Sequence, residues 1–294
     1  MSIERIVAAL ALEADADPVA ERAFQLARMH GAHLTLVHVL ENLILVEDDV
    51  AAWSALAMLR RTLEDSARER IEHLLTGRDC PDVEIIIDHG RAHERIEAIA
   101  DAQKADLLVI GPGNPGTLGE RLFGSTADRL TRGGFSPVLV VRTLAEGPYR
   151  HVAVALDFSP SSEQALALVA ELMPECALQI VHVVDLPLSF EQAMLKAGTP
   201  MTKIEAYRRS KAQAARASID ALLGGRNPDG LAPRIHIAEG RPGDVLTAMS
   251  REGSMDLLTI GAHGRNVVAR ALLGSVARQV SRRAACDVLI VSAT

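Results

Sequence analysis

The sequence predicts an α/β protein built from two doubly wound parallel sheets of five strands, one sheet in each half of the chain. The first observation is a repeat within the 294 residues: Asp106–Gly111 returns as Asp256–Gly261, and Val138–Val141 returns as Val288–Val291. The second is composition, because 48% of the residues are apolar but only 3% are aromatic, which is typical of buried parallel strands rich in aliphatic side chains. The third is the alternation of strand-like and helix-like segments, which forces parallel pairing through right-handed crossovers.

Five short runs rich in Val, Ile and Leu predict the strands of the first half, and four longer segments with helical periodicity predict its helices. The predicted strands are Arg5–Leu12, Leu34–Leu40, Val83–Asp88, Asp106–Gly111 and Val138–Val141. The predicted helices are Pro18–Met29, Val50–Leu75, Ala92–Gln103 and Leu118–Arg132. Strands and helices therefore alternate, and the half begins and ends with a strand.

The second half repeats this order. Its predicted strands are Val152–Leu156, Leu178–Val184, Arg234–Ala238, Asp256–Gly261 and Asp287–Val291. A linker near Thr143–Arg150, which contains Gly147 and Pro148, separates the halves. We therefore expect one domain over residues 1–143 and a second over residues 150–294, each long enough to bury its own core.

The charge balance and the cysteines exclude several classes of protein. The chain has 31 Lys and Arg against 38 Asp and Glu, a formal net charge of −7, so we expect no general attraction to nucleic acid. No apolar run approaches the ~18 residues that indicate a membrane-spanning helix, and Met1–Leu12 is predicted to contain a first strand and not a secretory signal. Three widely spaced cysteines without a C-x-x-C pair predict reduced thiols and a cytoplasmic location.

A glycine-rich segment follows the fourth strand of the second half. It places Gly261 and Gly264 three residues apart, and Gly274 and Ser275 follow after nine further residues. Ligands of open α/β sheets bind beyond the carboxyl ends of the strands, and glycine lets the backbone approach a phosphate at the start of a helix. The spacing is neither G-x-G-x-x-G nor a Walker loop, which disfavours a dinucleotide enzyme and a P-loop ATPase.

The combination resembles the universal stress protein family, in the form that carries two repeats in one chain. The resemblance rests on the Gly-x2-Gly-x9-Gly-Ser spacing, an aspartate that ends the first strand (Asp157), a Val-His-Val second strand and a terminal Val-Leu-Ile-Val strand. It covers essentially the whole chain. It implies the strand order 3-2-1-4-5 in each domain, and it implies ATP binding, which some members of the family show and others do not.

The resemblance also implies which residues form the site. It places adenine near Asp157 and the backbone of Val183, and it places the ribose and phosphates along Gly261, Gly264, Gly274, Ser275 and Val276. A carboxylate accepts a hydrogen bond from the exocyclic amine of adenine, and backbone amides and a serine hydroxyl donate to phosphate oxygens. Arg265 and Arg270, inside the nine-residue stretch, would add positive charge to an ATP site, with or without magnesium.

Each of these assignments has a structural alternative. Asp157 could cap the first helix of its domain together with Ser159, because Asp and Ser are preferred N-cap residues. The glycines could serve only as turn residues, and Arg265 could be a solvated surface side chain.

The first half departs from the motif at two positions. Ala11 stands in place of the strand-ending aspartate, and Asn114 stands in place of the second glycine. An asparagine side chain occupies space that a phosphate would need, and Pro112 and Pro115 remove two N–H donors from the loop. We therefore expect the first site to be empty or much weaker, with one nucleotide per chain in the second domain.

Other residues are less informative. His38 and His182 occupy matching places and are expected to bond to nearby backbone, and the pairs His30/His33 and His89/His93 have no evident Cys or His partners to complete a metal site. Trp53, Met58 and Leu63 on the second helix, with Phe190, Met194 and Leu195 in the other half, are expected to be core or a lid over a cavity.

These observations predict a cytoplasmic, ATP-binding protein that acts in stress regulation or protection. No catalytic order of Ser, His and Asp is present. No general base or metal-binding carboxylate can be named beside the phosphate loop, so at most slow ATP hydrolysis is expected. Through the resemblance we expect the two domains to pair as an intramolecular pseudo-dimer through their terminal strands, and further homodimerisation of the chain stays open. The alternative is a nucleotide-free scaffold that binds a protein or an apolar ligand through its second-helix surfaces.

Overall fold

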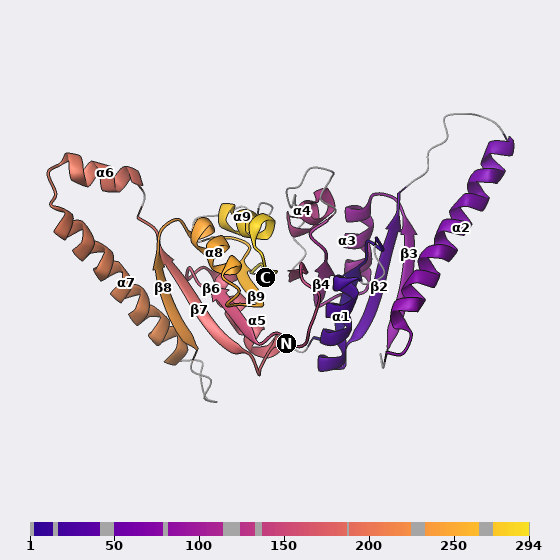
Figure 1. The fold of residues 1–294 in the computed structure, drawn as a ribbon, viewed down its shortest axis with the longest axis horizontal. Coiled ribbons are helices and arrows are strands. Elements are labelled where there is room, and N and C mark those ends of the chain that lie inside the picture. The colour runs from indigo at the N-terminus through magenta and orange to yellow at the C-terminus, as the bar shows by residue number, and fades with distance from the viewer. Residues whose placement is uncertain are drawn as a thin grey trace. The chain divides into compact units, whose positions relative to one another are not determined.

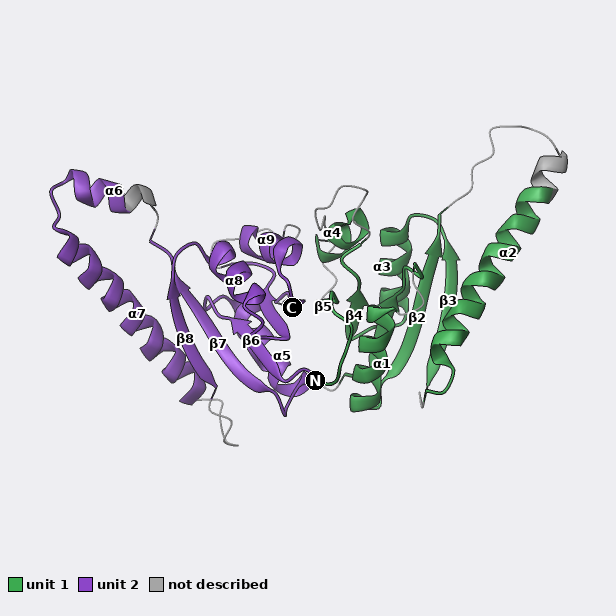
Figure 2. Cartoon of the chain, in the orientation of Figure 1, with its two compact units in different colours: residues 1–148 green, residues 149–294 purple. Residues whose placement is uncertain are grey.

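The computed structural model describes residues 3–13, 17–41, 50–78, 82–113, 124–132, 137–186, 188–224, 233–264 and 273–293. The chain divides into two compact units, Met1–Pro148 and Tyr149–Thr294 (Figure 2). Each unit contains a parallel sheet whose strands alternate with helices along the chain (Figure 1). The predicted α/β class is therefore confirmed.

The first unit contains five strands and four helices among its described residues. Its strands are β1 (Arg5–Ala9), β2 (His33–Leu40), β3 (Val83–His89), β4 (Leu107–Ile110) and β5 (Val138–Val140). Its helices are α1 (Pro18–His30), α2 (Val50–Leu75), α3 (Ala92–Ala102) and α4 (Ser125–Arg132).

The second unit repeats this order with one additional helix among its described residues. Its strands are β6 (His151–Ala155), β7 (Ala177–Val184), β8 (Arg234–Glu239), β9 (Leu257–Gly261) and β10 (Asp287–Val291). Its helices are α5 (Pro160–Leu172), α6 (Leu188–Lys196), α7 (Met201–Gly224), α8 (Pro242–Arg251) and α9 (Ser275–Arg283). Helix α6, which was not predicted, precedes the long helix α7.

The strand order is β3-β2-β1-β4-β5 in the first unit and β8-β7-β6-β9-β10 in the second, which is the expected order 3-2-1-4-5. All described pairings are parallel; for example, Ala8 stands opposite Leu36 on one side and Val109 on the other. Right-handed crossovers place α1 and α2 on one face of the sheet and α3 and α4 on the other. The central strands are therefore covered on both faces, and side chains such as Ile6 and Leu108 are completely buried.

The aspartate of the repeated Asp-Leu-Leu segment has a structural role in both units. Asp106 Oδ2 accepts hydrogen bonds from the backbone N–H groups of Glu4 and Arg5, each at 2.9 Å. Asp256 Oδ2 accepts equivalent bonds from Arg150 and His151 at 2.8 and 2.9 Å. Each carboxylate thus fixes the start of the first strand of its unit beside the fourth strand, which explains why the residue recurs.

One predicted strand boundary in the first unit is wrong. Strand β1 ends at Ala9 and not at Leu12, because the chain turns there and Leu12 adopts a left-handed φ of 56°. The second unit makes the same turn at Phe158, with a φ of 62°, so the turn is a property of the fold and not of one sequence. Helix α4 is described from Ser125, which follows Gly124, and the predicted start at Leu118 lies outside the described residues.

A buried hydroxyl in β9 yields the first testable prediction. Thr259 is fully buried, and no described group lies within hydrogen-bonding distance of its Oγ1. The first unit has Val109 at the equivalent place, also fully buried. Because an unpaired buried hydroxyl costs stability, Thr259→Val is expected to raise the unfolding free energy of the second unit by about 1 kcal/mol.

Urea denaturation followed by circular dichroism measures this change. The reverse substitution, Val109→Thr, serves as the matched control and is expected to destabilise the first unit by a similar amount. A Thr259→Val protein that is less stable than the wild type would show that the hydroxyl is satisfied in solution.

Candidate functional site

A cavity of about 260 Å³ lies at the carboxyl ends of β6, β7 and β9 in the second unit. This edge of an open α/β sheet is where ligands bind. Seven of the eight binding residues expected from the sequence line it: Asp157, Val183, Gly261, Gly264, Gly274, Ser275 and Val276. The eighth, Arg265, lies outside the described residues, as does Arg270.

Two glycines of the motif keep the wall of the cavity free of side chains. A Cβ on Gly264 would lie 3.3 Å from Asp157 Oδ2, and a Cβ on Gly274 would lie 3.1 Å from the carbonyl oxygen of Ala262. The Gly274 N–H donates to the same carbonyl at 2.8 Å, which draws the loop ends together before α9. The backbone can therefore approach a ligand closely at both positions.

Helix α9 presents its N-terminus to the cavity. It begins at Ser275 with Gly274 at the N-cap, and no side chain caps its first turn. Gly274, Ser275 and Val276 all line the cavity. Because the N–H groups of a first turn and the positive end of the helix dipole attract anions, a negatively charged group in the cavity would be stabilised here.

Gly261 is required for packing in a way the sequence did not reveal. A Cβ at this position would lie 2.8 Å from the backbone nitrogen of Ser162 and 3.0 Å from the carbonyl carbon of Ser161. The N-terminus of α5 therefore rests directly on Gly261. The equivalent Gly111 is less constrained, since a Cβ there would lie 3.5 Å from Cγ2 of Val19, an ordinary van der Waals distance.

Asp157 braces the cap of α5 as well as lining the cavity. Ser159 is the N-cap of α5, and its Oγ accepts from the backbone N–H of Ser162. Asp157 Oδ1 accepts from the Ser159 N–H at 3.0 Å and from the Ser159 hydroxyl at 2.5 Å. The capping alternative for Asp157 is therefore correct in part, because one carboxylate oxygen supports the cap while the other lies beside Gly264.

A second cavity of about 900 Å³ adjoins the first, beneath helix α7. The two cavities share Asp157, His182, Val183 and Val276. Sequence reasoning missed the residues that α7 contributes, among them Tyr207, Lys211 and Ala215. Their spacing of four residues puts them on one face of a helix, and this periodicity was the available signal.

Two matching histidines lie close to backbone carbonyls, and a third lines the first cavity. His182 Nδ1 lies 2.7 Å from the carbonyl oxygen of Leu156, and His38 Nδ1 lies 2.9 Å from that of Leu10. The expectation that both bond to nearby backbone is confirmed. His263, which was not predicted, lines the first cavity, and no described group lies within hydrogen-bonding distance of its Nε2.

One histidine of each pair with metal-ligand spacing lies beside a carboxylate. His33 Nδ1 lies 2.8 Å from Asp82, and His89 Nε2 lies 2.5 Å from Glu64. Within the described ranges, no group of three or more His, Cys, Asp or Glu side chains is arranged to hold a metal ion.

The corresponding loop of the first unit is closed more tightly. A Cβ on Gly113 would lie 2.6 Å from Cα of Gly124, and the Gly124 N–H donates to the carbonyl oxygen of Pro112 at 2.7 Å. Ala11 is exposed and supplies no carboxylate. Asn114 and Pro115 lie outside the described residues, so the prediction that they narrow the loop stays a prediction.

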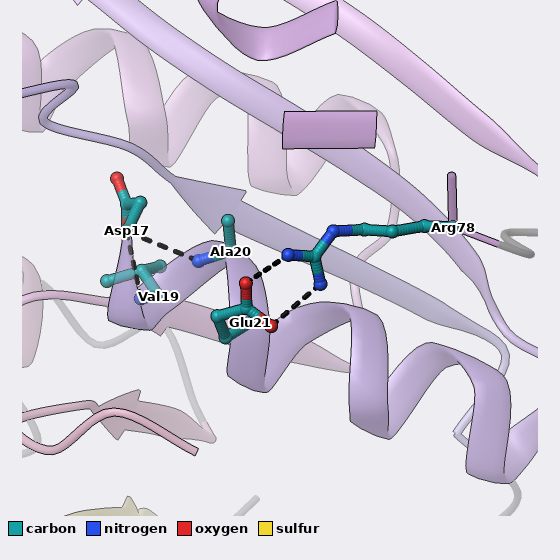
Figure 3. A network of polar contacts seen from close by, with 5 residues as sticks. All are labelled: Asp17, Val19, Ala20, Glu21 and Arg78. Carbon is teal, nitrogen blue, oxygen red and sulfur yellow. Dashed lines mark hydrogen bonds and ion pairs between the residues drawn. The ribbon is translucent and has the colours of Figure 1, made fainter. Parts of the chain in front are cut away.

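Helix α1 of the first unit has a buried aspartate, Asp17, as its cap (Figure 3). Its Oδ1 accepts from the backbone N–H groups of Val19 at 2.9 Å and Ala20 at 3.3 Å. One turn further on, Glu21 forms an ion pair with Arg78, whose Nη1 lies 2.7 Å from Glu21 Oε2. Asp17 thus takes the capping role that Ser159 has in the second unit, at the cost of burying a carboxylate.

The titration of Asp17 gives a pH-dependent prediction. Burial raises the pKa of Asp17, and hydrogen bonds from the backbone of Ala20, Val19 and Leu12 offset only part of this effect. The folded state therefore holds the proton at pH values where the unfolded chain has lost it, so this group makes the first unit less stable as pH rises above about 4.

Asp17→Ser is expected to remove this pH dependence while keeping the cap. Ser and Asp cap helices about equally, so the variant and the wild type are expected to agree within about 0.5 kcal/mol at acid pH. At neutral pH the variant is expected to be the more stable of the two. Urea denaturation of both proteins at a series of pH values measures the difference, and a difference that is constant with pH would contradict the assignment.

No helix within the described residues is long and apolar enough to cross a membrane.

The model of the universal stress protein family matches the chain twice, over residues 2–142 and 148–292. A universal stress protein of Mycolicibacterium smegmatis is 27% identical over 296 residues, which cover 95% of this chain and 93% of that protein. A shorter universal stress protein of Mycobacterium tuberculosis is 33% identical over 147 residues, covering 50% of this chain and 98% of the relative.

Solved structures show the same fold over the whole chain. A putative universal stress protein from Pseudomonas aeruginosa superposes with a TM-score of 0.65 at 20% identity, covering 99% of this chain and 94% of that one. A universal stress protein from Archaeoglobus fulgidus gives a TM-score of 0.64 at 17% identity, with 100% of both chains covered. Because the family model matches both units and nearly the full length, the chain belongs to the universal stress protein family and carries two of its repeats.

Proposed function

We propose that the chain binds one adenine nucleotide, ATP, in its second unit and that occupancy of this site regulates a stress response or a protective activity. The observation that carries the proposal is the cavity at the carboxyl ends of β6, β7 and β9. It combines a carboxylate with glycine backbone and an uncapped helix N-terminus. A hydrogen-bond acceptor beside anion-binding donors suits a base that carries an amine and is joined to phosphates.

Each lining residue has a role in this proposal. Asp157 accepts a hydrogen bond from the amine of adenine, and the backbone of Val183 contacts the edge of the base. The backbone N–H of Gly264, the N–H groups of the first turn of α9 and the hydroxyl of Ser275 donate to the phosphates, and Gly274 leaves room for them to approach. Magnesium would arrive with the nucleotide and be held mainly by its phosphates, because the described residues supply no cluster of ligands for it.

The proposed role is binding and not catalysis. Asp157 is the one carboxylate among the described residues that line the first cavity, and it is already engaged by Ser159. A general base that orients an attacking water is a recurring part of fast ATP hydrolysis. Hydrolysis is therefore expected to be much slower than release, so that ATP leaves the site intact.

Titration calorimetry with ATP and magnesium tests the proposal. We expect one site per chain, and we expect Asp157→Ala to lower the affinity by at least about tenfold through loss of the base contact. Mass spectrometry of gently purified protein provides a second readout, since a tightly bound nucleotide is retained. Two equivalent sites would contradict the expectation that the first site is empty or much weaker, and no binding at all would contradict the proposal itself.

The second cavity favours an alternative function. Its volume of about 900 Å³ lies within the range of pockets for small organic ligands, and α7 lines it with small side chains such as Ala214 and Ser218. On the equivalent helix α2, Met58 is 73% and Leu59 is 48% exposed. If the protein binds no nucleotide and instead binds an apolar ligand through these surfaces, its affinity for that ligand is expected to be the same with and without ATP.

Three further expectations stay predictions. These are the pairing of the two repeats through their terminal strands, homodimerisation of the chain and a cytoplasmic location. Analytical ultracentrifugation with and without ATP measures the second of them directly.

A further inference from the structure

The first turn of α5 connects the helix N-terminus to Asp157 through a chain of hydrogen bonds. The Ser162 N–H donates to Ser159 Oγ at 3.3 Å, and the Ser159 hydroxyl donates to Asp157 Oδ1 at 2.5 Å. In return, the Asp157 N–H donates to Ser162 Oγ at 3.3 Å, and that hydroxyl donates to the Ser159 carbonyl at 3.0 Å. Hydrogen bonds in such chains strengthen one another in a buried environment.

The serines of this network are buried, and they restrain the side chain of Asp157, which is itself exposed. Ser159 and Ser162 are each 1% exposed, and the backbone around Ser162 rests against Gly261. Two donors from Ser159 hold Oδ1, so the second oxygen, Oδ2, is turned toward Gly264 at the cavity wall. The carboxylate is therefore oriented before any ligand arrives, which lowers the entropic cost of binding.

Among its described residues, the first unit lacks both the aspartate and the serine cap of this arrangement. Ala11 replaces the aspartate, and Asp17 caps α1 by accepting the backbone N–H groups directly. Gly111 makes only an ordinary contact with Val19. The serine-based cap therefore occurs in the unit that has the carboxylate and is missing from the unit that does not.

We infer that Ser159 is a positioning residue for base recognition: its hydroxyl holds Asp157 so that Oδ2 reads the amine of the base. This inference rests on the proposed function, because it assumes that an adenine nucleotide occupies the cavity. Ser159 lines neither cavity among the residues found at their walls. It therefore acts through Asp157 and not by touching the ligand.

The test separates the cap from the positioning. Calorimetry compares ATP with inosine triphosphate, which has an oxygen in place of the amine, because a site built to accept from an amine discriminates against an analogue that carries an acceptor at that position. Ser159→Thr keeps both the cap and the hydroxyl donor. Ser159→Gly largely keeps the cap, since Gly in place of an N-cap Ser costs only a few tenths of a kcal/mol, but it has no hydroxyl to donate to Asp157.

The expected results are specific to this role. Ser159→Thr is expected to bind like the wild type, whereas Ser159→Gly and Ser159→Ala are expected to lose about tenfold in ATP affinity and most of the preference over inosine triphosphate. The matched control is Ser161→Ala, which removes another buried hydroxyl from the same turn. Ser161 Oγ accepts from the Ala293 N–H at 3.1 Å and is not part of the network around Asp157, so this control is expected to keep the preference.

Failure of the inference is distinguishable from failure of the proposed function. A wild type that binds neither nucleotide would overturn the proposed function. A wild type that prefers ATP, with the same preference kept in Ser159→Gly, would leave the function standing and overturn the role of Ser159. If Ser159→Ala is too unstable to measure, the comparison of Ser159→Gly with Ser159→Thr decides the question alone.

Discussion

Gly261→Ala is expected to destabilise the second unit by about 3 kcal/mol, the upper end of the usual cost of overpacking a core. The added Cβ would lie 2.8 Å from the Ser162 nitrogen and 3.0 Å from the Ser161 carbonyl carbon. These are backbone atoms of a helix, so they cannot move away as a flexible side chain would. The helix must shift as a whole, and the braced carboxylate of Asp157 is expected to shift with it.

Gly111→Ala in the first unit is the matched control. Here the new Cβ would lie 3.5 Å from a methyl group of Val19, which is a favourable distance. A glycine replaced by alanine at a compatible backbone position commonly gains about 0.4–1 kcal/mol, because the unfolded chain loses freedom. The same chemical change at two equivalent places is therefore expected to have opposite effects on stability.

Urea denaturation gives the two free energies, and hydrogen exchange assigns each change to its unit. In Gly261→Ala, faster exchange is expected at the N-terminus of α5 and along β9, where the clash occurs. Equal effects of the two substitutions would show that α5 does not rest on Gly261 as closely as the structure has it.

The fold could be predicted from the sequence because its signals are local and repeated. Buried strands such as Val138–Val141 are continuous aliphatic runs, and their alternation with helices leaves few topologies open. The errors occur where the backbone departs from regular geometry. Leu12 carries no sign in its side chain that it will adopt a left-handed φ of 56°, so the predicted strand continued through the turn.

The site was predicted less completely, and for a different physical reason. The motif identifies residues near one another along the chain, such as Gly274 and Ser275, and all the described members line one cavity. Contacts between distant segments have no such local signal. Two features arise from packing between distant segments: Gly261 supports α5, and Tyr207 of α7 lines an adjoining cavity.

For Asp157, a role in helix capping does not exclude ligand binding. Sequence alone set ligand binding against helix capping, because each uses a carboxylate at the end of a strand. The structure gives one oxygen to Ser159 at the cap and turns the other toward Gly264. The two carboxylate oxygens leave room for capping and ligand binding on one side chain. The sequence could not show this, because it does not give the orientation of the carboxylate.

Gly274→Glu is expected to lower the affinity for ATP by at least about 100-fold while leaving the second unit folded. The glutamate would place a negative charge at the N-terminus of α9, where no side chain caps the first turn. A carboxylate there is favourable for the helix, by about 0.3–1 kcal/mol. That gain offsets the strain of a Cβ 3.1 Å from the Ala262 carbonyl oxygen, so the change in stability is expected to be small.

The loss of binding follows from charge. Two like charges about 4 Å apart repel by about 4 kcal/mol at a dielectric constant near 20, which exceeds the 2.7 kcal/mol that corresponds to about 100-fold in affinity. Gly224→Glu, at the end of α7, is the matched control: it adds the same charge to the same unit, and a Cβ there meets nothing within 4 Å. It is expected to bind ATP like the wild type.

Adenosine, which has no phosphates, separates the two kinds of contact in the cavity. Its affinity is expected to change much less than that of ATP in Gly274→Glu, because repulsion acts only on a charged ligand. If adenosine and ATP weaken equally, the substitution has distorted the cavity, and the loss of affinity says nothing about phosphate. If ATP binds Gly274→Glu as tightly as the wild type, the phosphates do not lie at the N-terminus of α9, and the glycine motif serves the turn alone.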